Sequence, residues 1–328
     1  MKEILLYFLS GFALALALAP FVIIALRRLK AGQEILKHVD WHKSKSGTPT
    51  MGGVIFILPL VILAFFLLGH DTPLTNIAVF ASISYAVVGF LDDYLKIKRH
   101  DNLGLRAYQK IIGQGGIAVL VGIFYYMANP DGRIIVPFAN VTWDIGFWIM
   151  PLTVLVLIAT TNAVNLTDGV DGLAGSVSLI YFAALAALII LVSHIMPSAL
   201  PESEWRTLVI ICAVMAGAIL CYLLFNTNKA RVFMGDTGSL FLGGMVGALS
   251  MFSFMGFFIV ILGVMYVVSA LSVVIQVGYF KISHGKRVFL IAPYHHHLEK
   301  KGWAEARIVA LYMAVTILAG VVCTLSLL

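Results

Sequence analysis

Long apolar runs, separated by short polar connections, follow one another along the whole chain. Because an α-helix rises about 1.5 Å per residue, about 20 apolar residues cross the hydrocarbon layer of a membrane. The runs are continuous and do not alternate with polar residues, which favours helices over strands. Ten membrane helices are predicted, at residues 4–26, 51–69, 74–91, 111–128, 147–164, 173–195, 207–225, 237–254, 258–280 and 306–328.

Two of these regions allow more than one interpretation. Residues 239–280 contain no charged side chain and are too long for one helix, so a break is expected near Gly256. Residues 4–26 could be a cleaved signal peptide. That run is long enough to span a membrane, however, and it ends at Arg27 and Arg28, so a retained helix is predicted.

The composition supports this class, because 61% of the residues are hydrophobic and 12% are charged. Soluble proteins carry about 25% charged residues. Residues 1–328 are therefore expected to form a single integral membrane domain of the all-α polytopic class. The formal net charge of +6 suits anionic headgroups and anionic substrates at the cytoplasmic face rather than nucleic acid.

The lysines and arginines indicate the orientation. If the N-terminus lies outside, all but three of the 22 fall in connections on the inner side, and the exceptions are Lys2, Arg133 and Arg206. Cytoplasmic connections carry such an excess of basic residues. Both termini are thus predicted on the outer (periplasmic or extracellular) side. A turn signal at 129–132, followed by apolar residues, predicts a short β-hairpin there.

Every connection on the predicted inner side carries an unusual polar cluster. In residues 42–53, glycines let the backbone approach an anion and lysines such as Lys45 can meet phosphate; the alternative is a basic, flexible entry to a helix. The second cluster holds Asp92 and Asp93 at the predicted end of a helix. Acids there can bind a divalent cation or act as a base. The alternative is a solvated helix end paired with Lys96.

Two further connections are rich in oxygen ligands. Residues 162–172 combine asparagines with Asp168 and Asp171 and contain no basic residue, so a cation or a substrate donor group is the natural partner. A simple tight turn is the alternative. In residues 226–239, Asp236 opens a predicted helix and is either its N-cap or a metal ligand.

Aromatic and histidine side chains complete the set. Phe233 is either a core anchor or a ring that stacks on a base. The fifth connection contains His295, His296 and His297, whose consecutive spacing is not that of a zinc site. Histidines there suit phosphate contacts or proton transfer, and a surface cluster without a role is the alternative. Carboxylates and cations on one side of the membrane suggest a metal–phosphate active site at the cytoplasmic face.

Five strings in this order resemble the phospho-N-acetylmuramoyl-pentapeptide transferase family of the polyprenyl-phosphate N-acetylhexosamine-1-phosphate transferase superfamily. The resemblance extends from about Lys43 to Trp303, and the family's ten-helix fold agrees with the predicted count. The aspartate strings are typical of the superfamily, whereas the first and last favour this branch. The strings are GTPTMGG, LDDYLK, NAVNLTDGVDGLA, FMGDTGS and PYHHHLEKKGW.

The resemblance implies a reaction and its participants. UDP-N-acetylmuramoyl-pentapeptide and undecaprenyl phosphate would give undecaprenyl-diphospho-muramoyl-pentapeptide (lipid I) and UMP, with Mg²⁺ as cofactor, in peptidoglycan synthesis and cell wall biogenesis. It also implies a multi-pass protein of the bacterial inner (plasma) membrane, with the lipid bilayer as a partner and no nucleic acid, and it allows a homodimer.

The family pattern also assigns roles to residues. The implied catalytic residues are Asp92, Asp93, Asp168, Asp236 and His295. Asp236 and Asp168 would bind Mg²⁺, and Asp92 is the expected base that deprotonates the lipid phosphate. Phe233 would stack on uracil and Asp171 would contact the uridine. The implied substrate-binding residues are Lys45, Thr50, Lys96, Lys110, Asn165, Asp171, Asn226, Phe233, Ser239, Gln276, His296 and His297.

Two other functions remain open at this point. One is a related enzyme that transfers N-acetylglucosamine 1-phosphate from UDP-N-acetylglucosamine to a polyprenyl phosphate. The other is a lipid flippase or transporter. Transporters place their charges near the middle of the membrane on broken helices. In this chain the acidic residues lie at the predicted ends of the helices, which favours an enzyme.

Overall fold

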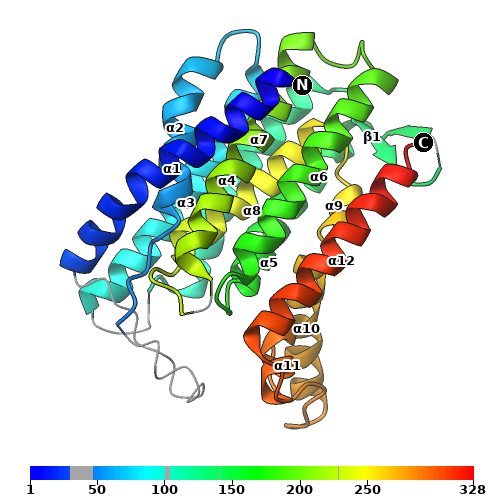
Figure 1. The fold of residues 1–328 in the computed structure, drawn as a ribbon. Coiled ribbons are helices and arrows are strands. Elements are labelled where there is room, and N and C mark those ends of the chain that lie inside the picture. Colours follow the sequence, from blue (N-terminus) through cyan, green and yellow to red (C-terminus); the bar gives the residue numbers. More distant parts are fainter. Residues whose placement is uncertain (30–46, 100–103, 140, 228) are drawn as a thin grey trace.

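The computed structural model describes residues 1–29, 47–99, 104–139, 141–227 and 229–328. They form a bundle of helices with one two-stranded sheet (Figure 1). The elements are α1 (Lys2–Arg28), α2 (Val54–Leu67), α3 (Pro73–Arg99), α4 (Ala107–Ala128), β1 (Arg133–Val136), β2 (Val141–Asp144), the 3-10 turn η2 (Gly146–Trp148), α5 (Ile149–Thr167), α6 (Leu173–Ile195), α7 (Glu202–Asn226), α8 (Gly235–Phe252), α9 (Phe258–Leu262), α10 (Val264–Ile282), α11 (Tyr294–Lys300) and α12 (Glu305–Leu325).

The fold agrees with a polytopic membrane protein built from helices. In the described part of the chain, eight helices are long and apolar enough to cross a membrane, namely α1, α3, α4, α5 with the turn before it, α6, α7, α10 and α12. The predicted spans at 51–69 and 237–254 correspond to α2, with 14 residues, and α8, with 18 residues. The count of ten spans therefore stays a prediction.

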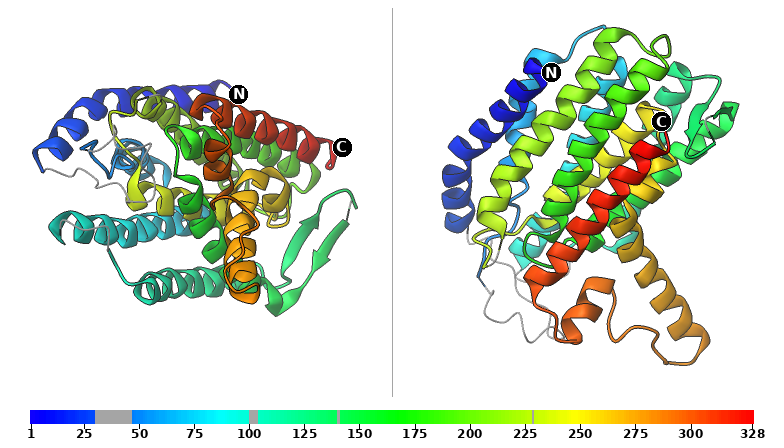
Figure 2. Two further views of the ribbon diagram at one scale, coloured as in Figure 1. Left: turned by 90° about the horizontal axis from the view of Figure 1, so that it is seen from below. Right: turned by 45° about the vertical axis from the view of Figure 1, so that its right-hand side comes forward.

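The long uncharged stretch is broken twice. The expected break near Gly256 lies between the end of α8 at Phe252 and the start of α9 at Phe258. A second break at Gly263 divides the predicted span 258–280 into the short α9 and the longer α10. Beyond it, α10 leans away from the other helices (Figure 2, right). The apolar pattern could not reveal this second break, because the run is uncharged on both sides of it.

Helix α8 occupies the centre of the bundle. Every residue from Thr237 to Phe252 is buried, and the helix packs against α3 and α5. Helix α7 is also largely buried and packs between α1 and α6. These contacts bring the beginning of α8 beside the end of α3, although the two segments are far apart in sequence.

The two ends of the bundle differ in character. The predicted hairpin is present: β1 and β2 pair antiparallel, with Arg133 opposite Asp144. The backbone N–H of Ile135 donates to Phe254 O at 2.8 Å, which ties the hairpin to the connection after α8. Both chain termini lie at this same end (Figure 1), which we call the hairpin end. The opposite end, where α3 ends and α8 begins, is called the carboxylate end; Figure 2 (left) views the molecule from that side.

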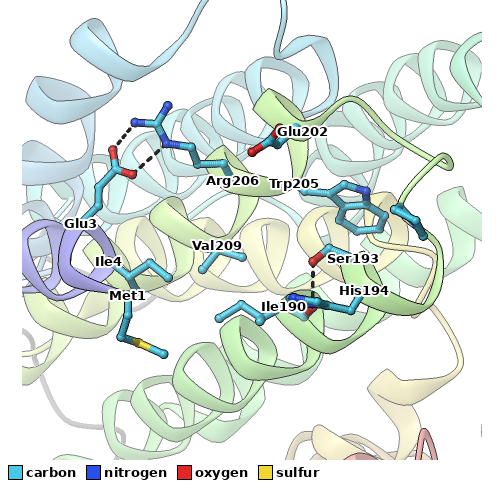
Figure 3. Close-up of a pocket in the computed structure, with 11 residues that line it drawn as sticks. Met1, Glu3, Ile4, Ile190, Ser193, His194, Glu202, Trp205, Arg206 and Val209 are labelled. Carbon is cyan, nitrogen blue, oxygen red and sulfur yellow. Dashed lines mark hydrogen bonds and ion pairs between the residues drawn. The ribbon is translucent and has the colours of Figure 1, made fainter.

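A cavity of about 590 Å³ opens at the hairpin end, between the starts of α1 and α7 and the end of α6 (Figure 3). The Arg206 guanidinium binds both oxygens of Glu3 at its rim. Apolar side chains such as Ile4, Ile190 and Val209 form much of its wall. None of the side chains that line it belongs to the predicted site.

Candidate active site

Three carboxylates meet at the carboxylate end. Asp92 and Asp93 come from α3 and Asp236 comes from the first turn of α8. One oxygen from each lies within 4.8 Å of the others, and Asp92 and Asp93 are 3% and 2% exposed. Carboxylates so close together and so well shielded from water repel one another unless cations neutralise them.

The apolar pattern predicts that the helix ends at the two adjacent aspartates, but the helix continues past them. Helix α3 continues for two more turns and ends at Arg99. The Lys96 ammonium lies 2.5 Å from Asp92 Oδ2, in the i,i+4 arrangement that supports a helix. Basic residues in the last turn also interact favourably with the helix dipole. The expectation of a helix end at Asp92 is therefore wrong, because charged side chains extend the helix beyond its apolar part.

Two lysines neutralise most of the negative charge. Lys96 Nζ lies 3.1 Å from Asp236 Oδ2, in addition to its contact with Asp92. Lys110 Nζ, from α4, lies 2.7 Å from the same Asp236 oxygen. Three carboxylates and two ammonium groups leave an excess of one negative charge when all are ionised. Such a site attracts cations, and the two lysines can also meet phosphate oxygens.

Asp93 contacts the backbone of α8. Asp93 Oδ1 accepts a hydrogen bond from the N–H of Asp236 at 3.1 Å, and Oδ2 accepts from the N–H of Thr237 at 2.9 Å and from Thr237 Oγ1 at 2.7 Å. These contacts cap the first turn of α8 from a neighbouring helix. Gly89 makes the approach possible, since a Cβ at that position would overlap the Asp236 carbonyl. The two adjacent aspartates therefore have different contacts: Asp93 holds the start of α8, while Asp92 contacts Lys96.

Helix α5 completes the surroundings of Asp236. Asn165 Nδ2 donates to Asp236 Oδ1 at 2.7 Å and to Ser239 Oγ at 2.8 Å. Ser239 in turn donates to Gly235 O at 3.1 Å. Asn165 lies on the last turns of α5 and not in the connection after it, because α5 extends to Thr167. Asp236 is therefore held by side chains from three other helices.

The connection between α5 and α6 brings further acidic groups. Asp171 Oδ2 accepts from the N–H of Ala230 at 3.0 Å, and Asn226 Oδ1 accepts from the N–H of Gly172 at 3.0 Å. These bonds join this connection to the end of α7 and to the connection before α8. Burial, and then the charges of Asp236, Asp93 and Asp171, raise the pKa of Asp168 to about 8.

Asp168 is not part of the group of three carboxylates that could hold one metal ion among the described residues. Sequence reasoning pairs it with Asp236 as a metal ligand, and that assignment stays a prediction.

The segment 47–53 packs directly on the connection before α8. Phe233 N donates to Pro49 O at 2.8 Å, and Gly52 N donates to Phe233 O at 2.7 Å. Thr50 is buried and its hydroxyl lies beside Gly235. The backbone of this segment thus holds Phe233, whose side chain is only partly buried. Lys45, which belongs to the same predicted cluster, lies outside the described residues.

The three histidines have different surroundings. The rings of His295 and His296 lie 4.3 Å apart, and both lie so close to Gly169 that a Cβ there would crowd them. His296 Nδ1 contacts Glu299 Oε2 at 2.5 Å. His297 turns instead to its own segment, where it accepts from Leu290 N at 3.1 Å. Of the three rings, those of His295 and His296 therefore lie against the connection between α5 and α6, which carries Asp168 and Asp171.

His297 and Gln276 hold the chain between α10 and α11. The His297 ring stacks on Tyr294 with centroids 5.8 Å apart. Burial, and then the Lys301 ammonium, lower the pKa of His297. Gln276 Oε1 accepts from the N–H of Phe289 at 2.8 Å. In this arrangement the two side chains shape the connection that presents His295 and His296.

Sequence reasoning missed several residues that hold the site. Glu299 stands three positions after His296 on α11, a spacing that places both on one helix face and could have revealed the pair. Thr237 and Gly89 have no comparable local signal, because their roles depend on the approach of α3 to α8.

The donor atoms fit a magnesium ion. Mg²⁺ in proteins prefers carboxylate oxygens and phosphate oxygens. Asp236 lies centrally in the cluster, with one oxygen bound by two lysines and the other by Asn165. A cation held by Asp236 would compete with these ammonium groups and release them toward a phosphate.

Comparisons with known proteins identify the family. The model of Glycosyl transferase family 4 matches residues 75–254, and Phospho-N-acetylmuramoyl-pentapeptide-transferase signature 1 matches residues 45–57. The chain is 43% identical over 332 residues to a phospho-N-acetylmuramoyl-pentapeptide-transferase of Clostridium kluyveri, with 100% of both chains covered.

Two further relatives carry the same name. One, from Clostridium novyi, is 42% identical and covers 97% of this chain and 95% of the relative. The other, from Desulfotalea psychrophila, is 38% identical and covers 94% and 88%. Both matches extend over the three-carboxylate cluster and the connections around it. The chain therefore belongs to the phospho-N-acetylmuramoyl-pentapeptide-transferases, which are glycosyl-1-phosphate transferases of peptidoglycan synthesis.

Proposed function

We propose that the chain transfers phospho-N-acetylmuramoyl-pentapeptide from UDP-N-acetylmuramoyl-pentapeptide to undecaprenyl phosphate, and that it requires Mg²⁺. The observation that carries this proposal is the convergence of Asp92, Asp93 and Asp236 with Lys96 and Lys110 at one end of a membrane bundle. A site at the end of the helices can receive a water-soluble donor and a lipid-bound acceptor together.

The proposed chemistry exchanges one phosphoanhydride bond for another. An oxygen of the lipid phosphate attacks the phosphorus that carries the sugar. The new bond joins the two phosphates of the lipid product, and the bond to the uridine phosphate breaks, so that UMP leaves. Negative charge grows on the bridging oxygen as it leaves. Transfer of this kind depends on positioning and on stabilisation of that charge. We favour direct attack over a covalent aspartyl intermediate.

Asp236 and Asp168 are the proposed Mg²⁺ ligands. When bound, the ion would neutralise the diphosphate oxygens and polarise the phosphorus that is attacked. Asn165 and Ser239 orient the Asp236 carboxylate through the hydrogen bonds described above. Lys110, Lys96 and Lys45 are the residues that we propose to contact phosphate oxygens.

Asp92 is the proposed base for the lipid phosphate. It is buried beside Lys96, and its Oδ1 accepts a hydrogen bond from Leu105 N at 2.8 Å. These contacts hold its carboxylate in one direction, as a base requires. Asp93 stays in the catalytic set, and its contacts with Thr237 support a role in orienting Asp236.

The surrounding residues would bind the donor. Phe233 is proposed to stack on uracil, with Asp171 near the uridine. His295 and His296 would contact phosphate or the sugar-peptide portion, and Gln276 would approach the peptide or sugar. The remaining proposed contacts are Thr50, Asn226 and His297.

Cellular placement follows from the same proposal. Residues 1–328 would form one integral domain of the bacterial inner membrane, with the carboxylate end facing the cytoplasm and the hairpin end facing outward. The charge distribution in the sequence supports that orientation. A homodimer is compatible with it.

A transfer assay tests the function. Purified protein in detergent or vesicles would be given undecaprenyl phosphate, Mg²⁺ and either UDP-N-acetylmuramoyl-pentapeptide or UDP-N-acetylglucosamine, each radiolabelled in the sugar. Labelled lipid and UMP are expected with the first donor, and EDTA should abolish both. Product formed only with the second donor would show the related N-acetylglucosamine enzyme. Movement of substrate across vesicles without lipid product would show a transporter.

A further inference from the structure

A second polar layer lies one helical turn behind the carboxylate cluster, on the side toward the middle of the bundle. Gln114 of α4 is 0% exposed, and its Oε1 accepts a hydrogen bond from Asn162 Nδ2 of α5 at 2.9 Å. Asn162 Nδ2 also donates to Ile158 O at 2.8 Å. The two side chains form the amide pair, a name we keep for Gln114 and Asn162.

The layer joins the same helices that hold Asp236. Tyr85 of α3 is fully buried, and its hydroxyl donates to the backbone carbonyl oxygen of Gln114 at 3.3 Å. The Tyr85 ring packs on Gly244 of α8, where a Cβ would overlap it. Helices α3, α4, α5 and α8 thus meet here as they do at the carboxylate cluster.

The spacing along each helix couples the two layers. Gln114 stands four residues after Lys110, and Asn162 stands three residues before Asn165. Residues three or four apart lie on the same face of an α-helix, one turn above the other. Lys110 contacts Asp236 Oδ2 and Asn165 contacts Asp236 Oδ1, at 2.7 Å each. A hydrogen bond between the amides therefore sets the distance between these two helices next to the Asp236 contacts.

Stability alone does not explain why amide side chains occupy these two buried positions. Gln114 Nε2 is buried and has no hydrogen-bond partner among the described residues. A buried donor left without a partner costs about 1–3 kcal/mol, whereas a hydrogen bond between helices in a membrane contributes about 0.6 kcal/mol on average. Two apolar side chains of similar shape would avoid that penalty. The magnitudes thus favour a positional role over a stabilising one.

We propose that the amide pair of Gln114 and Asn162 is a positioning pair that sets Lys110 and Asn165 against Asp236. Neither amide touches the reacting atoms. The inference deepens the proposed function, and its kinetic consequences rest on that function. The geometry of Lys110 can be measured without any turnover.

The test compares single variants with a swapped pair. Gln114→Leu and Asn162→Leu each remove the hydrogen bond. The double variant Gln114→Asn with Asn162→Gln keeps an amide on each helix and the same total side-chain length. Thr153→Val is the matched control, because Thr153 is also a buried polar residue of α5 but bonds only to Ile149 O of its own helix in the described structure.

Amine labelling reads the position of Lys110 directly. Metal-free protein without substrates is treated with limiting acetic anhydride, and the labelling of each lysine is measured by mass spectrometry. Labelling of Lys110 should rise about fivefold in Gln114→Leu and return to within about twofold in the swapped pair. Lys96 belongs to α3, so its labelling should stay within about twofold in every variant. Unchanged labelling of Lys110, or an equal rise at Lys96 that indicates general loosening, would overturn the proposal.

Kinetics provide the second measurement. In Gln114→Leu and Asn162→Leu, kcat should fall about tenfold while KM for the nucleotide-sugar donor stays within about twofold, because Asp236 acts on the phosphates and not on the nucleoside. The swapped pair should recover most of kcat, and Thr153→Val should match the unaltered protein. Loss of kcat that the swapped pair fails to recover would contradict a positioning role. If no variant, including the unaltered chain, forms product, the proposed function fails while the labelling result still stands.

Discussion

The two ends of the bundle both carry opposite charges, but they use them differently. At the hairpin end, Arg206 binds Glu3 one to one, and their side chains are 62% and 40% exposed. At the carboxylate end, Asp92 and Asp93 side chains are 4% and 3% exposed, and three carboxylates share two lysines. The Arg206–Glu3 pair is balanced and exposed, whereas the three-carboxylate cluster holds an excess of acid in a shielded place.

The difference indicates which end binds a ligand. An exposed ion pair contributes little to stability, and its two charges already balance each other. Several carboxylates gathered in one shielded place repel one another, so such a cluster is favourable where a cation, or an anionic substrate with its cation, completes it. The cavity beside Arg206 has no such cluster among the residues that line it, so we place the proposed site at the carboxylate end.

Removing the central carboxylate should have the largest effect. Asp236→Asn keeps the size of the side chain but removes the charge that binds Lys96, Lys110 and the proposed Mg²⁺. Transfer activity should fall about 1,000-fold or more, equivalent to about 4 kcal/mol of transition-state stabilisation. A radiolabel transfer assay measures this. Asp131→Asn, an exposed acid at the hairpin end, is the control and should keep full activity. Substantial Mg²⁺-dependent activity in Asp236→Asn would remove Asp236 from the site.

Changing Asp93 should affect structure and activity together. Asp93→Ala removes the acceptors for the first turn of α8, and loss of a helix cap costs about 0.5–2 kcal/mol. We expect a lower unfolding temperature and about 100-fold less transfer, since Asp236 lies in that turn. Asp93→Asn retains one acceptor oxygen and should lose less of both. Unaltered thermal stability combined with complete loss of activity would instead give Asp93 a direct part in the chemistry.

Two of the three consecutive histidines should differ in how much transfer activity is lost when each is replaced. His296→Ala removes a ring beside Gly169 that also contacts Glu299, and we expect transfer to fall about 30-fold, less than the roughly 100-fold or more that loss of a general acid or base costs. His297→Phe keeps a ring that can stack on Tyr294 and should stay within about threefold. Steady-state kinetics of both variants measure the difference. The reverse order of losses would show that His297 turns toward the substrate.

The smallest effect is expected at the hairpin end. Glu3→Gln and Arg206→Met each break the exposed ion pair, which should lower stability by less than about 1 kcal/mol. Transfer should stay within about twofold, because the pair lies at the end opposite Asp236. A large loss of activity with intact folding, measured in vesicles, would mean that the two ends are coupled and that the contrast between them is incomplete.

Much of the fold could be predicted because its signals are local. Continuous apolar runs predict the helices, and a turn signal before apolar residues predicts the hairpin of β1 and β2. The start of α8 beside Asp236 follows from the polar residues before it. The apolar pattern predicts that α3 ends near Asp92, whereas the helix continues to Arg99, because its last turns are charged. The break at Gly263 has no apolar signal at all.

For the candidate site too, some features are predictable from local sequence and others depend on the packing of distant segments. Hydropathy and residue type are local properties, so the sequence alone predicts a helical membrane protein and shows which connections carry acids, lysines and histidines. Three contacts became evident only in the folded molecule: Asp93 caps α8, His297 accepts from Leu290 N within its own segment, and Gln114 accepts from Asn162. The reason is physical: each of these contacts depends on how closely two helices or turns approach, and that distance is set by packing between distant segments.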